Sequence, residues 1–372
     1  PSQMCIKTCR YGRDDGNLCF VNTCLPQLCA ERNLRRFILL CTAVMLWGFF
    51  RTTALAADSA VILMYHRFGE ADHAQTNITI GQFEWHLAEL ENSEYTVLPI
   101  PEILRKLKSG TSLPERTIGI SIDDAFLSVF TEAYPRLKQR NLPFTLFVAT
   151  QPVDRKLRDY MNWDQIRELR DAGVTIGSQT HTHLHMARRG PTDSRKDVEA
   201  ANKRFVAELG QAPKLMAYPY GEAGLASMTV VRDLGFEFAF GQHSGVLHKN
   251  SPPYFLPRFA FNEVYGSKAR FRLVANALPL PVREVAPLDP LVAENPPAFG
   301  FTVDSSISEL SQLSCYHSQQ GKVGLERLGS HRIEVRFPRA FTAGRSRLNC
   351  TLPGAKNRWR WYGRQFYTKT SR

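Results

Sequence analysis

The run Thr117-Ile-Gly-Ile-Ser-Ile122 decides the fold, and it ends in two adjacent carboxylates, Asp123 and Asp124. A short apolar, β-branched run of this kind predicts a buried strand. From residue 60 to residue 241, similar runs alternate with longer amphipathic segments. Strands that alternate with helices predict βα units, and therefore a parallel sheet covered by helices.

The same pattern repeats along the chain and predicts an α/β protein. Strands are expected at 61–64, 95–98, 117–122, 144–148, 174–177, 214–218 and 236–240. Helices are expected at about 82–90, 101–108, 127–140, 163–172 and 194–209, and in a segment that ends at Leu234. Because no Gly-rich dinucleotide turn is present, the seven strands favour a distorted (β/α) barrel over a dinucleotide-binding sheet.

Composition changes after Leu278, where six prolines fall between residues 279 and 297. Such a stretch indicates a linker. Beyond it, strand-like runs such as Arg332-Ile-Glu-Val-Arg-Phe337 alternate with turn residues, which predicts a small β-rich domain. Four segments are expected: an upstream extension with a signal peptide (1–57), the barrel (58–280), a Pro-rich linker (281–297) and a basic β-rich domain (298–372).

A charged and then apolar segment near the start predicts export. Three arginines between residues 32 and 36 precede the apolar run 37–50, and Ala54-Leu55-Ala56 supplies a small-x-small cleavage site. This is the pattern of a secretory signal peptide, and the run is short for a spanning helix. We expect a periplasmic or secreted protein; contact with a membrane is expected only if the segment stays uncleaved as an anchor.

Cysteine usage agrees with export. Six of the eight cysteines lie before residue 42, and their spacings match no CxxC-type zinc pattern. Only Cys315 and Cys350 follow the cleavage site, and both would enter an oxidising compartment. We expect a disulfide between them; two buried free thiols are the alternative.

The net charge of +12 suggests an acidic partner, but the positive charge lies at the two ends of the chain. Residues 321–372 carry a net +11 and residues 1–57 a net +4, so residues 58–320 carry a net −3. We therefore expect no nucleic acid as partner. Arginines that surround Trp359 and Trp361 either bind sugars or an anionic envelope polymer, or cover the core of a sheet.

Chemistry-bearing residues gather where the strands end, which is where parallel barrels place their reactive groups. Of Asp123 and Asp124, one can ligate a metal while the other acts as a base, although an Asp before a helix is also a common N-cap. His181, His183 and His185 share one loop after the fifth strand. Imidazoles with a carboxylate are typical ligands of zinc, and also of cobalt or nickel.

Two further strand ends complete the candidate site. Pro219-Tyr220-Gly221 follows the sixth strand, and such a turn can expose a backbone N–H that binds an oxyanion or substrate. His66 follows the first strand and either lines the same rim or has a structural role.

These residues, in this order, resemble the polysaccharide deacetylase family, carbohydrate esterase family 4, over roughly residues 60–278. Ser121-Ile-Asp-Asp124 resembles the first motif of the family, the histidine loop its second, and Met216-Ala-Tyr-Pro-Tyr-Gly221 its third. The resemblance implies metal-dependent hydrolysis of an N-acetyl group on an acetylated polysaccharide. It also implies that Asp123 is the general base, that Asp124 binds the metal, and that the N–H of Tyr220 stabilises the oxyanion.

The sequence departs from the family pattern in ways that leave the site open. Read literally, the second motif places His181 and His185 at the metal; alignment of Ile176-Gly-Ser instead places Gln179 at the first ligand position and His183 at the second, and we prefer this register for His183. The first nitrogen ligand is then either absent or supplied by His181 or His185. Ala217 stands where many members have Arg, and Arg258 could orient Asp123 instead. The late Leu-x-His of the family, which supplies the general acid, is not found. The protein could therefore act on O-acetyl esters, or be an inactive glycan-binding protein.

Overall fold

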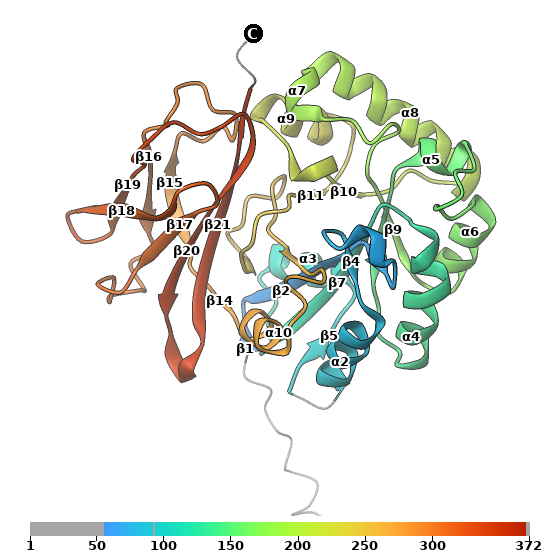
Figure 1. Ribbon diagram of the computed structural model, residues 1–372, viewed down its shortest axis with the longest axis horizontal. Helices are drawn as coiled ribbons and strands as arrows, with labels where there is room; N and C mark the ends of the chain where they lie inside the picture. Colours follow the sequence, from blue (N-terminus) through green and yellow to red (C-terminus); the bar gives the residue numbers. More distant parts are fainter. Residues whose placement is uncertain (1–55, 92–93, 370–372) are drawn as a thin grey trace, which may run out of the picture. The chain divides into compact units, whose positions relative to one another are not determined.

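The main sheet contains a path of seven hydrogen-bonded strands, in the order β11-β10-β9-β8-β7-β2-β12 (Figure 1). It is seen in a computed structural model that describes residues 56–91 and 94–369. The path consists of β2 (Ser59–Tyr65), β7 (Thr117–Asp123), β8 (Thr145–Val148), β9 (Thr175–Ser178), β10 (Leu215–Ala217), β11 (Phe238–Phe240) and β12 (Leu247–His248). The expected signal peptide and the six early cysteines lie outside the described residues.

All neighbouring strands from β2 to β11 in this path are parallel, and only β12 is antiparallel to its neighbour β2. Two short strands pair beside the path: β5 (Thr96–Val97) with β7, and β13 (Phe259–Ala260) with β2. Two small pairs lie outside this sheet: β1 (Ala56–Ala57) with β6 (Leu113–Pro114), and β3 (Arg67–Phe68) with β4 (Asn77–Ile78).

The α/β class is confirmed, but the closed seven-stranded barrel is not. The expected strand at 95–98 is reduced to β5, which pairs off the path, and the seven-strand path ends at β11 and β12 with no full-length closing strand between β11 and β2 in the described part of the chain. The physical reason lies in the chain after β11: it returns through an isolated bridge between Phe240 and Leu256 and through β13, so short segments occupy the place of a full closing strand.

Helices cover the sheet, and their ends follow ordinary capping rules. The Thr79 hydroxyl accepts a hydrogen bond from the N–H of Gln82 at the start of α2. Asn162 and Gln165 form a capping box at the start of α6. The helices are α2 (Ile80–Glu91), α3 (Ile100–Ser109), η2 (Val129–Ala133) with α4 (Tyr134–Gln139), α5 (Thr150–Asp154), α6 (Trp163–Asp171), α7 (Met186–Arg189), α8 (Pro191–Leu209), α9 (Leu225–Asp233) and α10 (Lys268–Ala275), with short turns at η1 (Ala71–His73), η3 (Pro219–Gly221) and η4 (Ala355–Asn357).

An apolar core fixes these helices on the sheet. Ile118, Ile120 and Ile122 of β7 point into one cluster with residues of α2, α4, α6 and α8, and all three are almost completely buried. Within residues 56–91 and 94–369, no helix combines the length and the apolar character that a membrane span needs.

A second sheet of eight strands follows, in the order β14-β21-β20-β17-β18-β19-β16-β15. It contains β14 (Leu278–Pro279), β15 (Val282–Ala286), β16 (Phe299–Val303), β17 (Ser314–His317), β18 (Gly321–Leu328), β19 (Arg332–Arg336), β20 (Gly344–Pro353) and β21 (Trp359–Thr368). We call it the C-terminal sheet. Residues 282–286, expected to be linker, are therefore strand: β15 lies at an edge of the sheet, where neighbouring prolines are tolerated.

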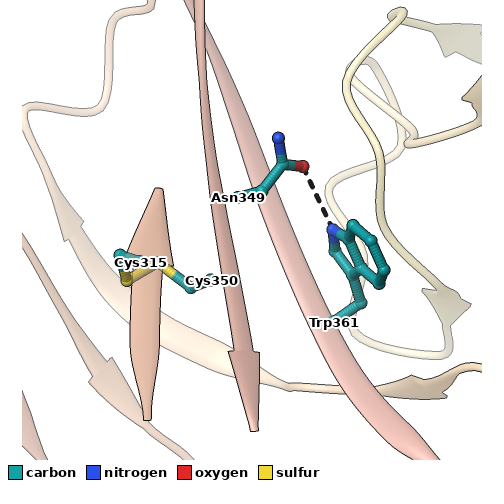
Figure 2. Close-up of a disulfide and its surroundings, with 4 residues drawn as sticks. All are labelled: Cys315, Asn349, Cys350 and Trp361. Carbon is teal, nitrogen blue, oxygen red and sulfur yellow. Dashed lines mark hydrogen bonds between the residues drawn. A yellow bond between two sulfur atoms is a disulfide. The ribbon is translucent and has the colours of Figure 1, made fainter. Parts of the chain in front are cut away.

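The expected disulfide is present and joins two adjacent strands of the C-terminal sheet (Figure 2). Cys315 of β17 lies directly opposite Cys350 of β20, and both are fully buried. On the neighbouring strand β21, the indole N–H of Trp361 donates to the Asn349 side chain over 3.1 Å, as Figure 2 shows. The Trp361 ring packs edge-on against Phe259, which brings this sheet against the α/β domain.

Candidate active site

The ends of the parallel strands bring the expected site residues to one edge of the main sheet. His66 follows β2, Asp123 ends β7, Gln179 follows β9, and the Pro219–Gly221 turn follows β10. Because these strands are parallel, their carboxyl ends all lie on that edge. A cavity of about 570 Å³ lies beside the loops that follow β3 and β7; Ser128 and Asp159 line it, and the site residues named above do not.

Asp123 is held by a bidentate ion pair with Arg258. The two terminal nitrogens of Arg258 donate to the two carboxylate oxygens over 2.6 and 2.9 Å, and both side chains are fully buried. The same guanidinium donates to the carbonyl of Gly241 and to the Ser121 hydroxyl. This fork geometry fixes the plane of the carboxylate, as bidentate Arg pairs do. The contact suggested from the sequence between Arg258 and Asp123 is therefore present.

Asp124 turns away from its neighbour and faces His183. Its Oδ1 lies 3.2 Å from Nε2 of His183, and both residues have left-handed backbone, with φ of +76° and +57°. Such φ values are unusual for non-glycine residues and are concentrated at functional sites. Burial raises the pKa of Asp124, but the neighbouring His183, with weaker effects of His66 and Arg67, lowers it below the ordinary value.

Gln179 lies beside Asp124, in the loop that also carries His183. It is fully buried, and its Oε1 accepts a hydrogen bond of 3.1 Å from the N–H of Asp124. Its Nε2 has no hydrogen-bond partner among the described residues. Gln179 thus links the end of β9 to the backbone of Asp124.

The other two histidines of the loop have different partners. Nδ1 of His181 lies 2.7 Å from the Thr150 hydroxyl. The backbone N–H of His181 donates to Asp197 of α8, which also accepts hydrogen bonds from Thr182 and so anchors the loop. His181 is therefore engaged with Thr150 and is not paired with Asp124.

His185 points toward the third motif. Its Nδ1 lies 2.8 Å from the buried carboxylate of Glu222, and its ring stacks on Tyr220 with centroids 3.8 Å apart. The His183 ring also contacts Tyr220, edge-on at 4.5 Å. The structure thus separates the three histidines, and only His183 meets Asp124.

The residues at Asp124 fit a divalent metal, with an incomplete donor set. Asp124 Oδ1 and His183 Nε2 are buried and have no other hydrogen-bond partner in the part of the chain that the structure describes, which is typical of side chains prepared for a ligand. A carboxylate and an imidazole are two members of the usual catalytic zinc set of three. The third place falls to the amide of Gln179, a weaker donor, and no group of three His, Cys, Asp or Glu side chains converges in the described residues.

The Pro219–Gly221 turn presents one backbone donor. The N–H groups of Gly221 and Glu222 donate to the carbonyls of Tyr218 and Pro219, and Pro219 has no N–H. The remaining N–H of the turn belongs to Tyr220, whose φ of +59° is again left-handed. Burial, followed by the charges of Asp124 and Glu222, raises the pKa of the Tyr220 hydroxyl.

Two further side chains complete the rim. Nε2 of His66 lies 3.8 Å from Oδ2 of Asp123, and its side chain is 13% exposed. Tyr160 was not expected from the sequence: burial and then the charge of Asp124 raise its pKa to about 12, so its hydroxyl stays protonated near neutral pH. Tyr160, like Thr150, Asp197 and Glu222, belongs to no recognisable sequence motif. Only the contacts in the folded chain show that these residues lie at the site.

Comparisons with known proteins point to one family. Residues 110–239 match the polysaccharide deacetylase family model. Poly-beta-1,6-N-acetyl-D-glucosamine N-deacetylase from Staphylococcus aureus (strain MSSA476) is 26% identical over 234 residues, which cover 55% of this chain and 80% of the relative. The solved structure of IcaB from Ammonifex degensii is 25% identical, with a TM-score of 0.52 over 59% of this chain and 96% of that chain.

The fold is shared more widely than the sequence. The deacetylase PplD from Streptococcus pyogenes, solved in complex with acetate, has a TM-score of 0.54 at 18% identity and covers 58% of this chain and 98% of its own. Over residues 110–239 the chain is similar to the polysaccharide deacetylase family, and over a longer stretch it is similar to these relatives. The N-deacetylase named above is a hydrolase that acts on carbon–nitrogen bonds other than peptide bonds.

Proposed function

We propose that this protein removes N-acetyl groups from an extracellular or envelope polysaccharide by hydrolysis. The observation that carries the proposal is that two adjacent carboxylates have different partners: Asp123 forms an ion pair with Arg258, and Asp124 faces His183. The relatives named above, an N-deacetylase of a polysaccharide among them, support the same substrate class. We also propose that the protein is exported, as a periplasmic or secreted protein.

Asp123 acts as the general base in this proposal. Each of its oxygens accepts one hydrogen bond from Arg258, and a carboxylate offers about four lone-pair sites, so lone pairs remain for a water molecule. Water loses its proton to Asp123 as it attacks the acetyl carbonyl. The N–H of Tyr220 stabilises the oxygen that becomes negative, and Tyr220, Pro219 and His66 bind the sugar at the rim.

Asp124 and His183, with the amide of Gln179, hold the cofactor. A divalent cation, most simply zinc with cobalt or nickel as substitutes, would polarise the acetyl carbonyl and lower the pKa of the attacking water. His181 and His185 are not assigned as ligands, because Thr150 and Glu222 are their partners.

His66 is our candidate for the general acid that the sequence lacks. It lies beside the base, 3.8 Å from Asp123, and its partial exposure lets it reach a bound substrate. A proton donated from this imidazole would allow the amine to leave. An O-acetyl ester needs less help from an acid, because an alkoxide is a better leaving group than an amide anion, so esters remain possible substrates.

Acetate release tests the proposal. Acetylated glucosamine oligomers and an acetylated-sugar ester are incubated with the protein, with added zinc or cobalt, beside the variant Asp123→Asn. We expect metal-dependent release that the variant lowers by about 10²-fold or more, as for the loss of a general base. No release from either substrate by the metal-loaded protein would refute catalysis.

One observation favours a second candidate, a glycan-binding protein without activity. Gln179 stands where an imidazole would complete the metal site, and its amide binds the Asp124 backbone. This candidate predicts that the purified protein contains no stoichiometric metal but still binds the oligomers. Metal analysis with a binding titration separates the two.

The role of the C-terminal sheet as a site for an anionic envelope polymer stays a prediction. Several arginines that suggested it make other contacts: Arg358 binds Glu115 and the Asn276 carbonyl, Arg360 binds the Pro279 carbonyl, and Arg364 is buried against the Leu288 carbonyl. These contacts match the alternative in which the arginines pack the sheet.

A further inference from the structure

Two residues of the C-terminal sheet reach the turn that carries the proposed oxyanion donor. The side-chain amide of Gln365, on β21, donates to the carbonyls of Gly221 and Tyr220 over 2.7 and 3.3 Å. Arg345, on β20, donates to the Tyr220 carbonyl over 3.1 Å. The two partners lie 125 and 145 residues from Tyr220 in the sequence, so these contacts are tertiary.

The side-chain amide of Gln365 is buried, and its hydrogen bonds depend on the turn. Gln365 is 1% exposed, and burial of an amide is costly unless its hydrogen bonds are made. Its Nε2 serves the turn, while its Oε1 accepts from Nε of Arg347. The amide therefore satisfies both its donor and its acceptor only when the turn keeps its observed conformation.

Arg345 adds a contact with the side chains of the site. Its guanidinium carbon lies 5.5 Å from the centre of the Tyr220 ring, and its Nε lies 3.5 Å from the Glu222 carboxylate. Glu222 in turn holds His185, which stacks on Tyr220. Arg345, Glu222 and His185 thus form a closed set of contacts around one ring.

The turn needs such support. Tyr220 has left-handed backbone, a conformation that persists in a bulky residue only when its surroundings fix it. A Cβ on Gly221 would lie 2.5 Å from the Gln242 nitrogen, so the turn also has little space in which to move. Pinning the carbonyls of Tyr220 and Gly221 fixes the two peptide planes that follow Tyr220, and so restricts the backbone rotation that would redirect the Tyr220 N–H.

We infer that the C-terminal sheet is part of the catalytic unit, and that Gln365 and Arg345 are positioning residues that aim the Tyr220 N–H at the reacting acetyl group. The inference rests on the proposed function for its kinetic consequence. Its structural consequence, an ordered turn, stands without it.

The kinetic test compares Arg345→Ala and Arg345→Lys with Arg336→Ala. Arg336 is a matched control, because it is an exposed arginine of the same sheet and pairs with Glu326, remote from the turn. Misaiming a donor that acts in the transition state lowers kcat, so we expect Arg345→Ala to lose about 10- to 100-fold in kcat with little change in KM. Arg345→Lys should recover part of the loss, because it keeps the charge, and Arg336→Ala should match the wild type.

Hydrogen–deuterium exchange of the peptide that contains residues 218–222 separates this inference from the proposed function. Gln365→Leu and Arg345→Ala should both speed exchange there, at temperatures where melting curves show that each variant is folded, while Arg336→Ala should not. If wild-type protein shows no deacetylation but the variants speed exchange, the proposed function fails and the positioning contact stands. Unchanged exchange and unchanged kcat in Arg345→Ala would overturn the inference.

Discussion

Arg258 and Asp123 meet through two parallel hydrogen bonds although 135 residues separate them in the sequence. Neither side chain has measurable exposure, so the pair is a buried charge pair in which each partner compensates the other. The base of the proposed reaction is thereby also a structural element. Loss of either partner should show in folding as well as in catalysis.

Asp123→Asn is expected to lower the free energy of unfolding by about 3–5 kcal/mol, because it leaves the Arg258 guanidinium buried without a counter-charge. Arg258→Lys keeps the positive charge but loses the bidentate hydrogen bonds, so its free energy of unfolding should lie between those of Asp123→Asn and the wild type. Urea denaturation measures both. Arg336→Ala breaks an exposed pair and should cost less than about 1 kcal/mol. An Asp123→Asn protein as stable as the wild type would contradict this account.

Gln179→His should tighten zinc binding by about tenfold or more, because it adds a second imidazole to the carboxylate of Asp124 and the imidazole of His183. Even changes behind the ligands alter metal affinity by roughly 10–100-fold. Competition with a chromophoric chelator measures the affinity without any substrate. The double variant Gln179→His with Asp124→Asn serves as control and should lose the gain; equal affinity of Gln179→His and the wild type argues against this ligand position.

His66→Gln should affect amide and ester substrates differently. If His66 protonates the leaving amine, its loss lowers kcat on acetamide substrates by about 10²–10⁴-fold and lowers kcat on esters less. The ratio of the two rates is the informative quantity, since a general disturbance of the site would lower both. His73→Gln, an exposed histidine of η1, is the control. An unchanged amide-to-ester ratio in His66→Gln assigns it to substrate binding instead.

Stability should fall in mild acid, and His317 gives a way to test the cause. Its ring is 2% exposed, stacks on Phe341, and has no hydrogen-bond partner on either nitrogen among the described residues. Burial lowers its pKa to about 4 from 6.5. A lowered pKa in the folded state means that the unfolded chain takes up the proton first. The stability that the protein gains from keeping the His317 ring neutral is therefore fully present above pH 6.5, and it is lost as the pH falls toward 4.

His317→Phe removes this proton-binding difference, and it should flatten the decline in stability between pH 6.5 and 4 by up to about 3 kcal/mol. Burial also lowers the pKa values of His86 and His248 to about 4 and of His243 to about 3, so part of the decline remains. Denaturant titrations at a series of pH values measure the slope. The same slope in wild type and variant would show that the His317 ring is already charged in the folded protein.

Reduction of the Cys315–Cys350 disulfide should destabilise the C-terminal sheet. The bridge spans 35 residues, and in the chain-entropy model a loop of that length stabilises the folded state by about 4 kcal/mol. The double variant Cys315→Ala, Cys350→Ala is compared with the wild type, both without reductant. Because both cysteines are buried, reduction of the wild type should be slow until it unfolds. An undiminished melting temperature in the double variant would contradict the prediction.

The strands that carry the site were predictable, because buried parallel strands leave a mark in the sequence. Thr117–Asp123 is an unbroken buried strand, and the carboxylates come at its end, as the pattern indicated. The closure of the sheet was not predictable. It depends on short pairings such as β13 with β2, which involve two residues and leave no periodic signal.

The histidine loop shows where sequence reasoning stops. The sequence alone does not distinguish the three histidines of the loop. In the folded chain each has a different partner from another part of the sequence: His181 contacts Thr150, His183 contacts Asp124 and His185 contacts Glu222. Likewise, the prolines near β15 indicated a linker, since a pattern cannot tell an edge strand from a loop. In both cases long-range packing decides between local alternatives.

The hydrogen bonds from β20 and β21 to the Tyr220 turn also have a consequence for the order in which the protein matures. The Tyr220 turn is synthesised 125 and 145 residues before Arg345 and Gln365, and β13, the last strand of the main sheet, already ends at Ala260. An unfinished chain could thus assemble the strands around Asp123 while the turn still lacks its outer supports. Docking of β20 and β21 on the turn would then be the last step that completes the site.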